Sequence, residues 1–403
     1  MADFHQNGCV TTLHNLTKAP LDQLEQQIRS FATTRKITLI LPSLFSELET
    51  PALSGILDEL AGADYINHIV IGLDRANEEQ FNYAKKFFSR LPQQHSILWN
   101  DGPRLKALHN RLEAAGLAPK EPGKGRNVWY CIGYALACQD SDVVALHDCD
   151  ITTYSREMLV RLIFPVSNPN FPYQFCKGYY PRIASGKLNG RVCRLLVSPL
   201  LMALQKTCGH NDYIEYLQGF RYPLAGEFAM RTSILPDIRI PSDWGLEIGV
   251  LSEVWRNLSS RSVCQVDIAD AYDHKHQSLS KGDAKKGLSR MSTDISKALF
   301  RKLATDGVIF NLETFRTIKA TYYRLALDLI EMYHNDAQMN GLSTDRHQEE
   351  EAVELFAANI VEAGQKFLDN PMETPFIPNW SRIQSAEPDM LREMQEAVSA
   401  DAG

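Results

Sequence analysis

The chain lacks several features that define broad classes of protein. No run of 18 consecutive apolar residues occurs, so no membrane-spanning helix is expected. The segment from Met1 to Leu13 is polar and has no basic region followed by an apolar stretch, so no secretory signal is expected. Lys and Arg number 42 against 49 Asp and Glu, a formal net charge of -7. This balance argues against binding to nucleic acid or to anionic membranes, so an anionic substrate needs a local basic cluster.

The eight cysteines include no Cys-x-x-Cys pair and lie mostly in apolar or helical contexts. They therefore predict reduced core residues of a cytoplasmic protein. No internal repeat or low-complexity tract is present. A length of 403 residues with 44% hydrophobic content is enough for one large domain with an appendage, or for two domains.

Residues 21–31 carry apolar side chains at helical spacing, and the next hundred residues alternate between predicted strands and helices. Strands are expected at 37–41, ending at Pro42, and at 66–73, 96–99 and 142–146. Helices are expected at 51–61, 78–91, 104–115 and 127–138. This alternation predicts a parallel sheet that is covered by helices on both faces.

After Ile151 the pattern becomes irregular and richer in aromatic and basic residues, which suggests the acceptor side of a cleft. A helix at 246–257 and a strand at 262–268 are expected, followed by a polar patch at 272–277. From Thr293 onward the chain is predicted to be helical, with apolar stripes in 315–333 and 353–367 that suit a core or a subunit interface. A linker at 371–378 and a surface helix with a loose tail after Ser385 complete the prediction.

The most informative motif follows the apolar run 142–146. Asp148 and Asp150 stand two residues apart, so in an extended segment both point to one side and Cys149 to the other. Carboxylates of this kind hold Mg²⁺ or Mn²⁺ together with substrate phosphates, at the strand end where open α/β sheets bind ligands. The alternative is turn chemistry that closes a strand.

Other candidate residues are scattered along the chain. Lys124 lies in Pro122-Gly123-Lys124-Gly125-Arg126-Asn127, a glycine loop with a cation before a helix, which suits a phosphate but is not a Walker A loop. His274 and His276 are one residue apart, and a single imidazole is enough to complete a carboxylate metal site. An exposed turn and two surface histidines are the alternative interpretations.

Two further segments and a basic cluster have a possible role in binding. Glu227, next to Gly226, is a candidate to accept a proton or to bind a sugar hydroxyl. In the cluster 243–249, Trp244 is predicted to be a core residue rather than a platform for a sugar. A local basic field, with a helix that starts near Gly190, suits a phosphorylated or carboxylated small molecule. Its members are Lys177, Arg182, Lys187, Arg191 and Arg194.

Taken together, these residues resemble glycosyltransferase family 81, the glucosyl-3-phosphoglycerate synthases. The resemblance rests on an ordered set of motifs over about residues 35–280. These are Pro42-Ser43-Leu44 with Glu47, Pro122-Gly123-Lys124-Gly125, Asp148-Cys149-Asp150, Gly190-Arg191-Val192, Gly226-Glu227-Phe228, Gly245-Leu246-Glu247-Ile248-Gly249 and His274.

The resemblance implies a GT-A fold, an α/β architecture with a Rossmann-like, mixed and mainly parallel sheet. The expected organisation is an N-terminal helical segment (1–34), a catalytic domain (35–290) and a helical C-terminal region (291–403). The catalytic domain is expected to divide into a donor half (35–151) and an acceptor half (152–290). The expected reaction is retaining, metal-dependent transfer of glucose from UDP-, GDP- or ADP-glucose to 3-phosphoglycerate.

The resemblance also implies roles for individual residues. Asp148 is expected to contact the ribose, and Asp150 and His274 to hold Mg²⁺ or Mn²⁺, with Asp148 as the further carboxylate of the metal site. Glu227, Asp150 and Lys124 are the expected catalytic residues. The nucleotide is expected to contact Pro42, Leu44, Glu47, Asp74, Lys124 and Asp148. The acceptor and the sugar are expected to contact Gly190, Arg191, Val192, Glu227 and Glu247.

The chain departs from the family pattern in three places. Phe45 and Ser46 stand where Asn and Glu are frequent, Cys193 replaces a usual threonine after Gly190-Arg191-Val192, and the C-terminal region is longer than expected. Three alternatives remain open: a mannosyl-3-phosphoglycerate synthase, or another GT-A enzyme with a small anionic acceptor; a sugar nucleotidyltransferase; and a non-catalytic sugar-nucleotide sensor. A homodimer is expected from the helical stripes.

Overall fold

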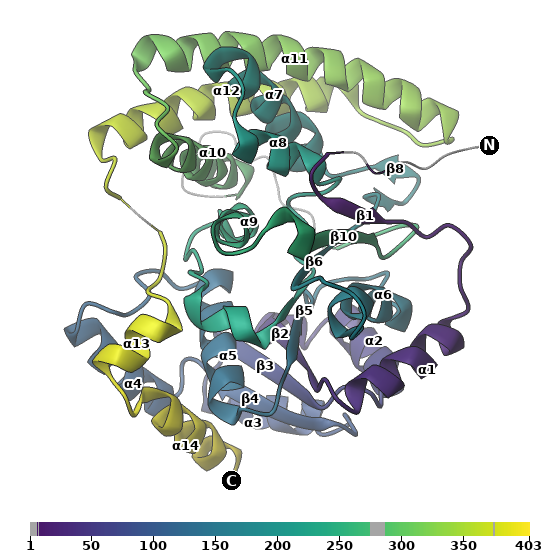
Figure 1. The fold of residues 1–403 in the computed structure, drawn as a ribbon, viewed down its shortest axis with the longest axis vertical. Coiled ribbons are helices and arrows are strands. Elements are labelled where there is room, and N and C mark those ends of the chain that lie inside the picture. The colour runs from purple at the N-terminus through teal and green to yellow at the C-terminus, as the bar shows by residue number, and fades with distance from the viewer. Residues whose placement is uncertain (1–5, 7, 275–286, 374) are drawn as a thin grey trace.

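A computed structural model describes residues 6, 8–274, 287–373 and 375–403, and it is built around a single large sheet (Figure 1). The strand order is β1-β10-β6-β9-β5-β2-β3-β4. Every neighbouring pair is parallel except the two made by β9, which runs antiparallel to β5 and β6. The strands are β1 (Thr11–Leu13), β2 (Ile37–Leu44), β3 (His68–Asp74), β4 (Gln94–Trp99), β5 (Val143–Leu146), β6 (Phe175–Tyr179), β9 (Phe228–Arg231) and β10 (Val263–Asp267). The predicted mixed, mainly parallel α/β fold is therefore confirmed.

Helices cover both faces of the sheet. One face packs against α1 (Leu21–Ala32), α2 (Pro51–Leu60), α3 (Glu78–Phe88) and α6 (Arg156–Ser167). The other packs against α4 (Pro103–Ala114) and α5 (Lys124–Cys138). Alternate strand residues feed the two cores, as the pleat of a strand requires: Ile40 and Val70 lie in one core, and Leu39 and Ile71 in the other.

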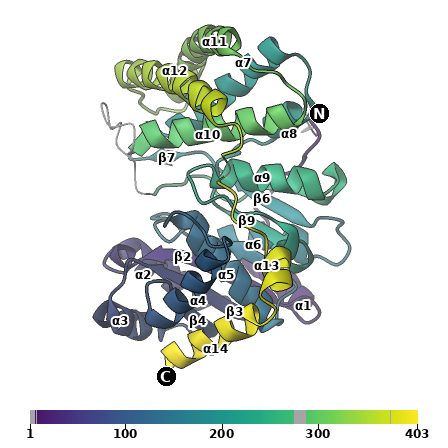
Figure 2. The ribbon, with the colours of Figure 1, turned by 90° about the vertical axis from the view of Figure 1, so that its left-hand side faces the viewer.

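The remaining helices form two separate groups (Figure 2). Above the sheet in the figure, α7 (Ser198–Cys208), α8 (Asp212–Gly219) and α9 (Leu246–Asn257) lie near α10 (Gly287–Thr305), α11 (Leu312–Met339) and α12 (Arg346–Asp369). The chain then descends to α13 (Trp380–Ala386) and α14 (Met390–Ala402), and α14 packs on α4, α5 and β4. A small separate hairpin joins β7 (Ile183–Ala184) to β8 (Lys187–Leu188).

Three sequence expectations about the fold are wrong. The first strand does not end at Pro42 but continues to Leu44. Its neighbour β5 pairs with it only as far as Ile40, so the missing N–H of the proline removes no bond on that side. The tail after Ser385 is not loose, since α14 buries Met390, Met394 and Val398 and Arg104 pairs with the buried Asp401.

The third error concerns the segment after Ile151, which is regular rather than irregular. It contains α6, β6, α7, α8 and β9. Nearly all of α6 is buried, so it shows no one-sided apolar stripe and carries no helical signature in the sequence. The helix expected near Gly190 is present as a π-helical segment, Val192–Val197, that continues into α7.

All eight cysteines are free. Among the described residues, no helix has both the length and the apolar character needed to cross a membrane. Most residues of the apolar stripes expected in the C-terminal region are core residues of the chain itself, for example Phe315, Tyr322 and Phe356.

Candidate active site at the carboxyl edge of the sheet

Side chains from both halves of the chain meet where the parallel strands end. Glu47 follows β2, Asp74 is the last residue of β3, and Asp148 follows β5. The antiparallel strand β9 starts at this same edge, because Phe228 pairs with Leu146 on one side and with Lys177 on the other. Glu227, immediately before β9, is thereby brought to the edge where open α/β sheets bind ligands.

Lys124 is the first residue of α5, and its ammonium group pairs with two carboxylates at this edge. Its Nζ lies 2.6 Å from Asp148 Oδ1 and 3.3 Å from Glu247 Oε1. Burial alone lowers the pKa of Lys124, but the charges of Asp148 and Glu247 outweigh that effect and raise the pKa. Burial likewise raises the pKa of Asp148, and the nearby Lys124 overcomes it, so the net direction is downward. Both groups are therefore charged at neutral pH.

Gly226 is needed for this arrangement. A Cβ at this position would lie 2.5 Å from Asp148 Oδ2 and 3.0 Å from Lys124 Nζ. The glycine of the Gly226-Glu227 segment thus allows the backbone to approach the ion pair of Asp148 and Lys124, which no other residue could do without moving them.

Asp150 meets His274 across an isolated antiparallel bridge between Ile151 and His274. Asp150 Oδ2 lies 3.7 Å from His274 Nδ1, and Arg182 Nη1 lies 2.5 Å from Nε2, so Nδ1 is the nitrogen that faces the carboxylate. Burial, followed by repulsion from Asp148, raises the pKa of Asp150 to about 6. His276, the other candidate histidine, lies outside the described residues.

A carboxylate and an imidazole are ligands that Mn²⁺ and Mg²⁺ sites use, and their spacing lets both reach one ion. Burial and the charge of Asp148 raise the pKa of Asp150 against the opposing positive charges of Lys124 and Arg182, and a bound cation would further favour the charged carboxylate. The third expected ligand differs: among the described residues, Asp148, Asp150 and His274 do not form a group whose ligand atoms all lie within 4.8 Å of one another. Asp148 is paired with Lys124 instead, so the residues fit an ion centred on Asp150 and His274.

Glu227 is fully buried between two tyrosines that the sequence interpretation did not single out. The hydroxyls of Tyr180 and Tyr272 each donate to one of its carboxylate oxygens at 2.7 Å, and the two rings stack at 3.7 Å. Burial and the charge of Asp148 raise the pKa of Glu227, against the opposing effect of the tyrosines. These two hydrogen bonds fix the positions of both carboxylate oxygens of Glu227. The only sequence signal was the aromatic content of 173–180 and 272–274.

Two acidic residues of the predicted nucleotide side already have partners within the protein. Glu47 accepts from the backbone N–H of Leu44 at 3.0 Å and from the Ser43 hydroxyl at 3.2 Å. Burial raises its pKa to about 7, and Asp150 adds to the effect. Pro42 and Leu44 are part of the same strand end.

Asp74 is buried and accepts from Arg126 and Asn100, each at 2.9 Å. Arg126, two residues after Lys124 on α5, therefore links the expected phosphate loop to β3. The sequence identified Asp74 and Arg126 separately, each as part of a motif. It did not predict their ion pair, because the two residues are 52 positions apart in the chain.

Gly190 and Arg191 lead into the π-helical segment, whose first residue is Val192. Gly190 has a φ of +78°, in the left-handed region that favours glycine. A Cβ at this position would point at Arg182 and Tyr222. Arg191 is half-buried and its pKa is lowered by burial and by Arg194. Its cationic side chain stands at the start of a helical segment, an arrangement that suits an anionic group.

The expected basic field does not form a single surface patch. Lys177 is buried in β6 and donates to Ala225 O at 2.7 Å, and burial lowers its pKa to about 8. Arg194 is also buried, and its Nη2 lies 2.5 Å from Glu349 Oε1 of α12. Only Lys187 is exposed. These cations were grouped by sequence proximity, which does not show that β6 and the π-helical segment turn some of them inward.

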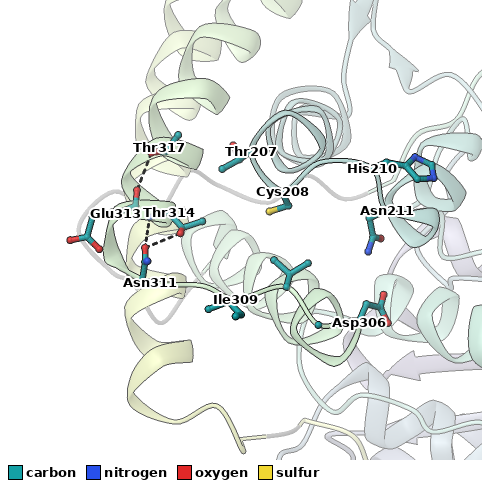
Figure 3. A pocket seen from close by; sticks show the side chains of 12 residues that line it. Thr207, Cys208, His210, Asn211, Asp306, Ile309, Asn311, Glu313, Thr314 and Thr317 are labelled. Carbon is teal, nitrogen blue, oxygen red and sulfur yellow. Dashed lines mark hydrogen bonds between the residues drawn. The ribbon is translucent and has the colours of Figure 1, made fainter.

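Trp244 is not the core residue that was expected, since 40% of it is exposed. Around it, the residues from Asp243 to Gly245 form a bend in which Gly245 N donates to Asp243 Oδ1. A large cavity elsewhere, of about 580 Å³, lies between the C-terminal end of α7 and the start of α11, away from these residues (Figure 3). It contains none of the candidate site residues.

Comparison with known proteins gives a consistent result. No protein-family model matches the chain. A protein named glucosyl-3-phosphoglycerate synthase from Persephonella marina is 44% identical over 401 residues, which cover 100% of this chain and 99% of the relative. One of the same name from Methanococcoides burtonii is 38% identical over 404 residues, covering 99% and 98%.

Among solved structures, the fold is similar to that of glucosyl-3-phosphoglycerate synthase from Mycobacterium tuberculosis in complex with Mn²⁺, UDP-glucose and phosphoglyceric acid. The TM-score is 0.53 with 20% sequence identity, over 75% of this chain and 89% of the other. At this identity the similarity establishes the fold alone.

Proposed function

The chain belongs to the glucosyl-3-phosphoglycerate synthase family, and on this premise we propose that it transfers glucose from a nucleotide-diphosphate sugar to 3-phosphoglycerate. The observation that carries the proposal is the convergence of Lys124, Asp148, Asp150 and His274 at the carboxyl edge of the sheet. That convergence suits a diphosphate held by a cation and a divalent ion.

The donor half is assigned to the strand ends. Pro42, Leu44 and Glu47 line the nucleotide, with Asp74 held near the base through Arg126. Asp148 contacts the ribose, and Lys124 contacts the diphosphate. Asp150 and His274 hold Mg²⁺ or Mn²⁺; when bound, the ion neutralises charge that develops on the leaving diphosphate. Asp148-Cys149-Asp150 then functions as the Asp-x-Asp motif of the enzyme.

The acceptor half is assigned to Gly190, Arg191 and Val192, with Arg191 pairing with the phosphate or carboxylate of 3-phosphoglycerate. Arg182, next to His274 and Gly190, lies where the two substrates would meet. The thiol of Cys193 cannot replace the hydroxyl that the family usually has there. Glu247 contacts the transferred sugar and helps to orient Lys124, to which it is bonded.

Glu227 positions the donor sugar rather than acting as a nucleophile. Both of its carboxylate oxygens already accept bonds from Tyr180 and Tyr272, which limits attack on an anomeric carbon and supports hydrogen bonding to a hydroxyl instead. Retention then follows from attack by the acceptor 2-hydroxyl on the face that the diphosphate leaves. Lys124 stabilises the departing phosphate oxygen that accepts the proton of that hydroxyl.

The decisive experiment measures nucleotide release from UDP-, GDP- and ADP-glucose and from GDP-mannose, with and without 3-phosphoglycerate, in the presence of Mg²⁺ or Mn²⁺. We expect acceptor-dependent release from a glucose donor. Preference for the mannose donor would identify a mannosyl-3-phosphoglycerate synthase, and binding without turnover would identify a sensor. A parallel reaction with nucleoside triphosphate and sugar phosphate tests the remaining alternative, since release of diphosphate there would identify a nucleotidyltransferase.

We also propose that the protein is cytoplasmic and forms a homodimer. The apolar residues Met332 and Met339 on α11 are 64% and 90% exposed, and this uncovered apolar surface supports a contact between copies. Analytical ultracentrifugation of the full chain and of Met332→Lys tests this proposal. The unmodified chain should sediment as a dimer, and the substituted chain should dissociate toward the monomer. A monomeric unmodified chain, or a dimer that Met332→Lys leaves unchanged, would contradict it.

A further inference from the structure

The edge of the sheet opposite the candidate active site carries a second group of potential metal ligands. His68 is the first residue of β3, Cys138 is the last residue of α5, and Asp140 lies in the turn between α5 and β5. One ligand atom from each of the three lies within 4.8 Å of the other two. None of these residues belongs to the motifs on which the proposed function rests.

Two atoms in this group are buried and have no hydrogen-bond partner. His68 is 1% exposed, and neither its Nδ1 nor Oδ1 of Asp140 forms a hydrogen bond. Buried polar atoms in native proteins are almost always paired, so these two unpaired atoms call for an explanation. The other oxygen of Asp140, Oδ2, lies 3.5 Å from His68 Nδ1 and accepts from Asn67 Nδ2 at 3.4 Å, and a cation held by Nδ1 and this carboxylate would give the imidazole a partner.

The other nitrogen of the ring supports this interpretation. His68 Nε2 lies 3.0 Å from Ser96 Oγ, which also accepts from the Tyr134 hydroxyl at 2.9 Å. When the ring proton is on Nε2, His68 donates to Ser96 Oγ and the lone pair of Nδ1 faces Asp140; a cation bound at Nδ1 selects this tautomer over the one in which the Ser96 hydroxyl donates to Nε2. Histidine ligands of metals commonly donate their second ring N–H to a nearby oxygen in this way.

The spacing of the atoms suits a tetrahedral ion better than a hydrogen bond. His68 Nδ1 lies 3.5 Å from Asp140 Oδ2, beyond the usual hydrogen-bond range of roughly 2.7–3.2 Å. Two ligands about 2.0–2.1 Å from a tetrahedral zinc ion are about 3.3 Å apart. Sulfur, imidazole nitrogen and carboxylate oxygen are all zinc ligands, and the partial exposure of Asp140 leaves room for water as the fourth.

We propose that His68, Cys138 and Asp140 bind a zinc ion that is separate from the ion of the active site. The sulfur–zinc bond forms as the Cys138 thiol releases its proton to solvent. The ion would tie the end of α5 to the start of β3. These two elements are already in close contact at Gly72, whose carbonyl accepts from Asn127 at 2.8 Å, and they carry Lys124 and Asp74 at their other ends.

The chain offers an internal comparison for this proposal. His210, Asp212 and Glu215 also place ligand atoms within 4.8 Å of one another, at the start of α8 beside the cavity of Figure 3. All three are exposed, and His210 Nε2 is bonded to Asp212 at 2.9 Å. That group has no buried, unpaired atom, so it supports no proposal, and it serves as a reference for weak surface binding.

Cobalt substitution tests the site directly, because a thiolate bound to Co²⁺ absorbs in the near ultraviolet and carboxylate or imidazole ligands do not. The full-length protein is stripped with chelator under reducing conditions and titrated with Co²⁺, then with Zn²⁺. We expect a thiolate band that reaches one equivalent and is lost when Zn²⁺ is added. Cys208→Ser, which removes another half-buried thiol, should keep the band, and Cys138→Ser should abolish it.

Two further variants separate this site from the active site. Asp140→Asn should weaken Zn²⁺ binding at least tenfold, while Asp150→Ala should leave the thiolate band unchanged. A Zn²⁺ concentration about a hundred times the Kd should raise the Tm of the unmodified chain by about 3 °C more than that of Cys138→Ser. Absence of the band in the unmodified chain, its persistence in Cys138→Ser, or its loss in Asp150→Ala would overturn the proposal.

Discussion

The proposed donor and acceptor halves of the candidate site are held in place in different ways. On the donor side, Glu47, Asp74 and Asp148 each stand at the end of a strand, and the sheet itself sets their positions. On the acceptor side, Gly190 and Arg191 lead into the π-helical segment Val192–Val197, which helices more than a hundred residues later hold in place. Arg194 pairs with Glu349 of α12, and Tyr322 of α11 donates to Leu195 O at 2.6 Å.

This difference suggests how each half responds to change. Substitution of Asp150, which follows β5, should alter chemistry and leave the fold intact, because no backbone hydrogen bond of the sheet depends on its side chain. Substitutions in the C-terminal helices should alter acceptor binding and stability together, although they touch neither substrate. The C-terminal helices have a physical role under this proposal, as a support for the proposed acceptor segment.

The largest effect is expected for Asp150→Ala. Loss of the carboxylate that faces His274 should lower kcat by roughly 10³-fold or more, equivalent to about 4 kcal/mol of transition-state stabilisation. Thermal unfolding should be unchanged or shifted upward, because burial and Asp148 already disfavour a charge at this position. Asp270→Ala, at an exposed carboxylate bonded to Lys18, is the control and should be fully active. Normal turnover by Asp150→Ala would mean that the ion binds elsewhere.

The second largest effect is expected for Glu349→Ala. The substitution leaves the guanidinium of Arg194 buried without its carboxylate, which should cost about 3 kcal/mol of unfolding free energy. The KM for 3-phosphoglycerate should rise while the affinity for UDP is unchanged, as measured by steady-state kinetics and calorimetry. Glu350→Ala, whose partner Arg346 is exposed, is the matched control and should cost less than about 0.5 kcal/mol. Equal losses of donor and acceptor affinity would contradict the division into two halves.

Arg191→Ala should act on the acceptor alone. Removing a cation that pairs with a phosphate or carboxylate should raise the KM for 3-phosphoglycerate by about 10- to 100-fold, or roughly 1.4–2.7 kcal/mol, with little change in donor affinity. Lys187→Ala removes an exposed cation of the same segment and should change neither constant. Similar effects of the two substitutions would indicate general surface charge rather than a specific contact.

The smallest effect is expected for Tyr322→Phe. Loss of the hydroxyl that bonds to Leu195 O should cost about 1 kcal/mol of unfolding free energy and change the acceptor KM by no more than about threefold. Tyr323→Phe, next to it on the exposed side of α11, should have no effect on either quantity. If chemical denaturation shows the two variants to be equally stable, the contact between α11 and the π-helical segment does not support the acceptor half.

The donor half was largely predictable from the sequence because its elements are local. Apolar runs that alternate with predicted helices identified β2, β3 and β5. The polar residues that follow each run mark the carboxyl edge of the sheet. The acceptor half was not predictable in the same way. A buried helix such as α6 has no polar face to produce a period, and the short strand β9 gives no sign of its direction.

Residue types and their spacing along the chain determined which chemistry is available: two carboxylates after a buried strand, a lysine at a helix start, and an ordered set of motifs. Only the tertiary structure decided how those groups are combined. It pairs Asp148 with Lys124 and Asp150 with His274, encloses Glu227 between Tyr180 and Tyr272, and turns Lys177 and Arg194 inward. The physical reason is that charge pairing and burial depend on distances in space between residues far apart in the chain, whereas sequence patterns report on near neighbours.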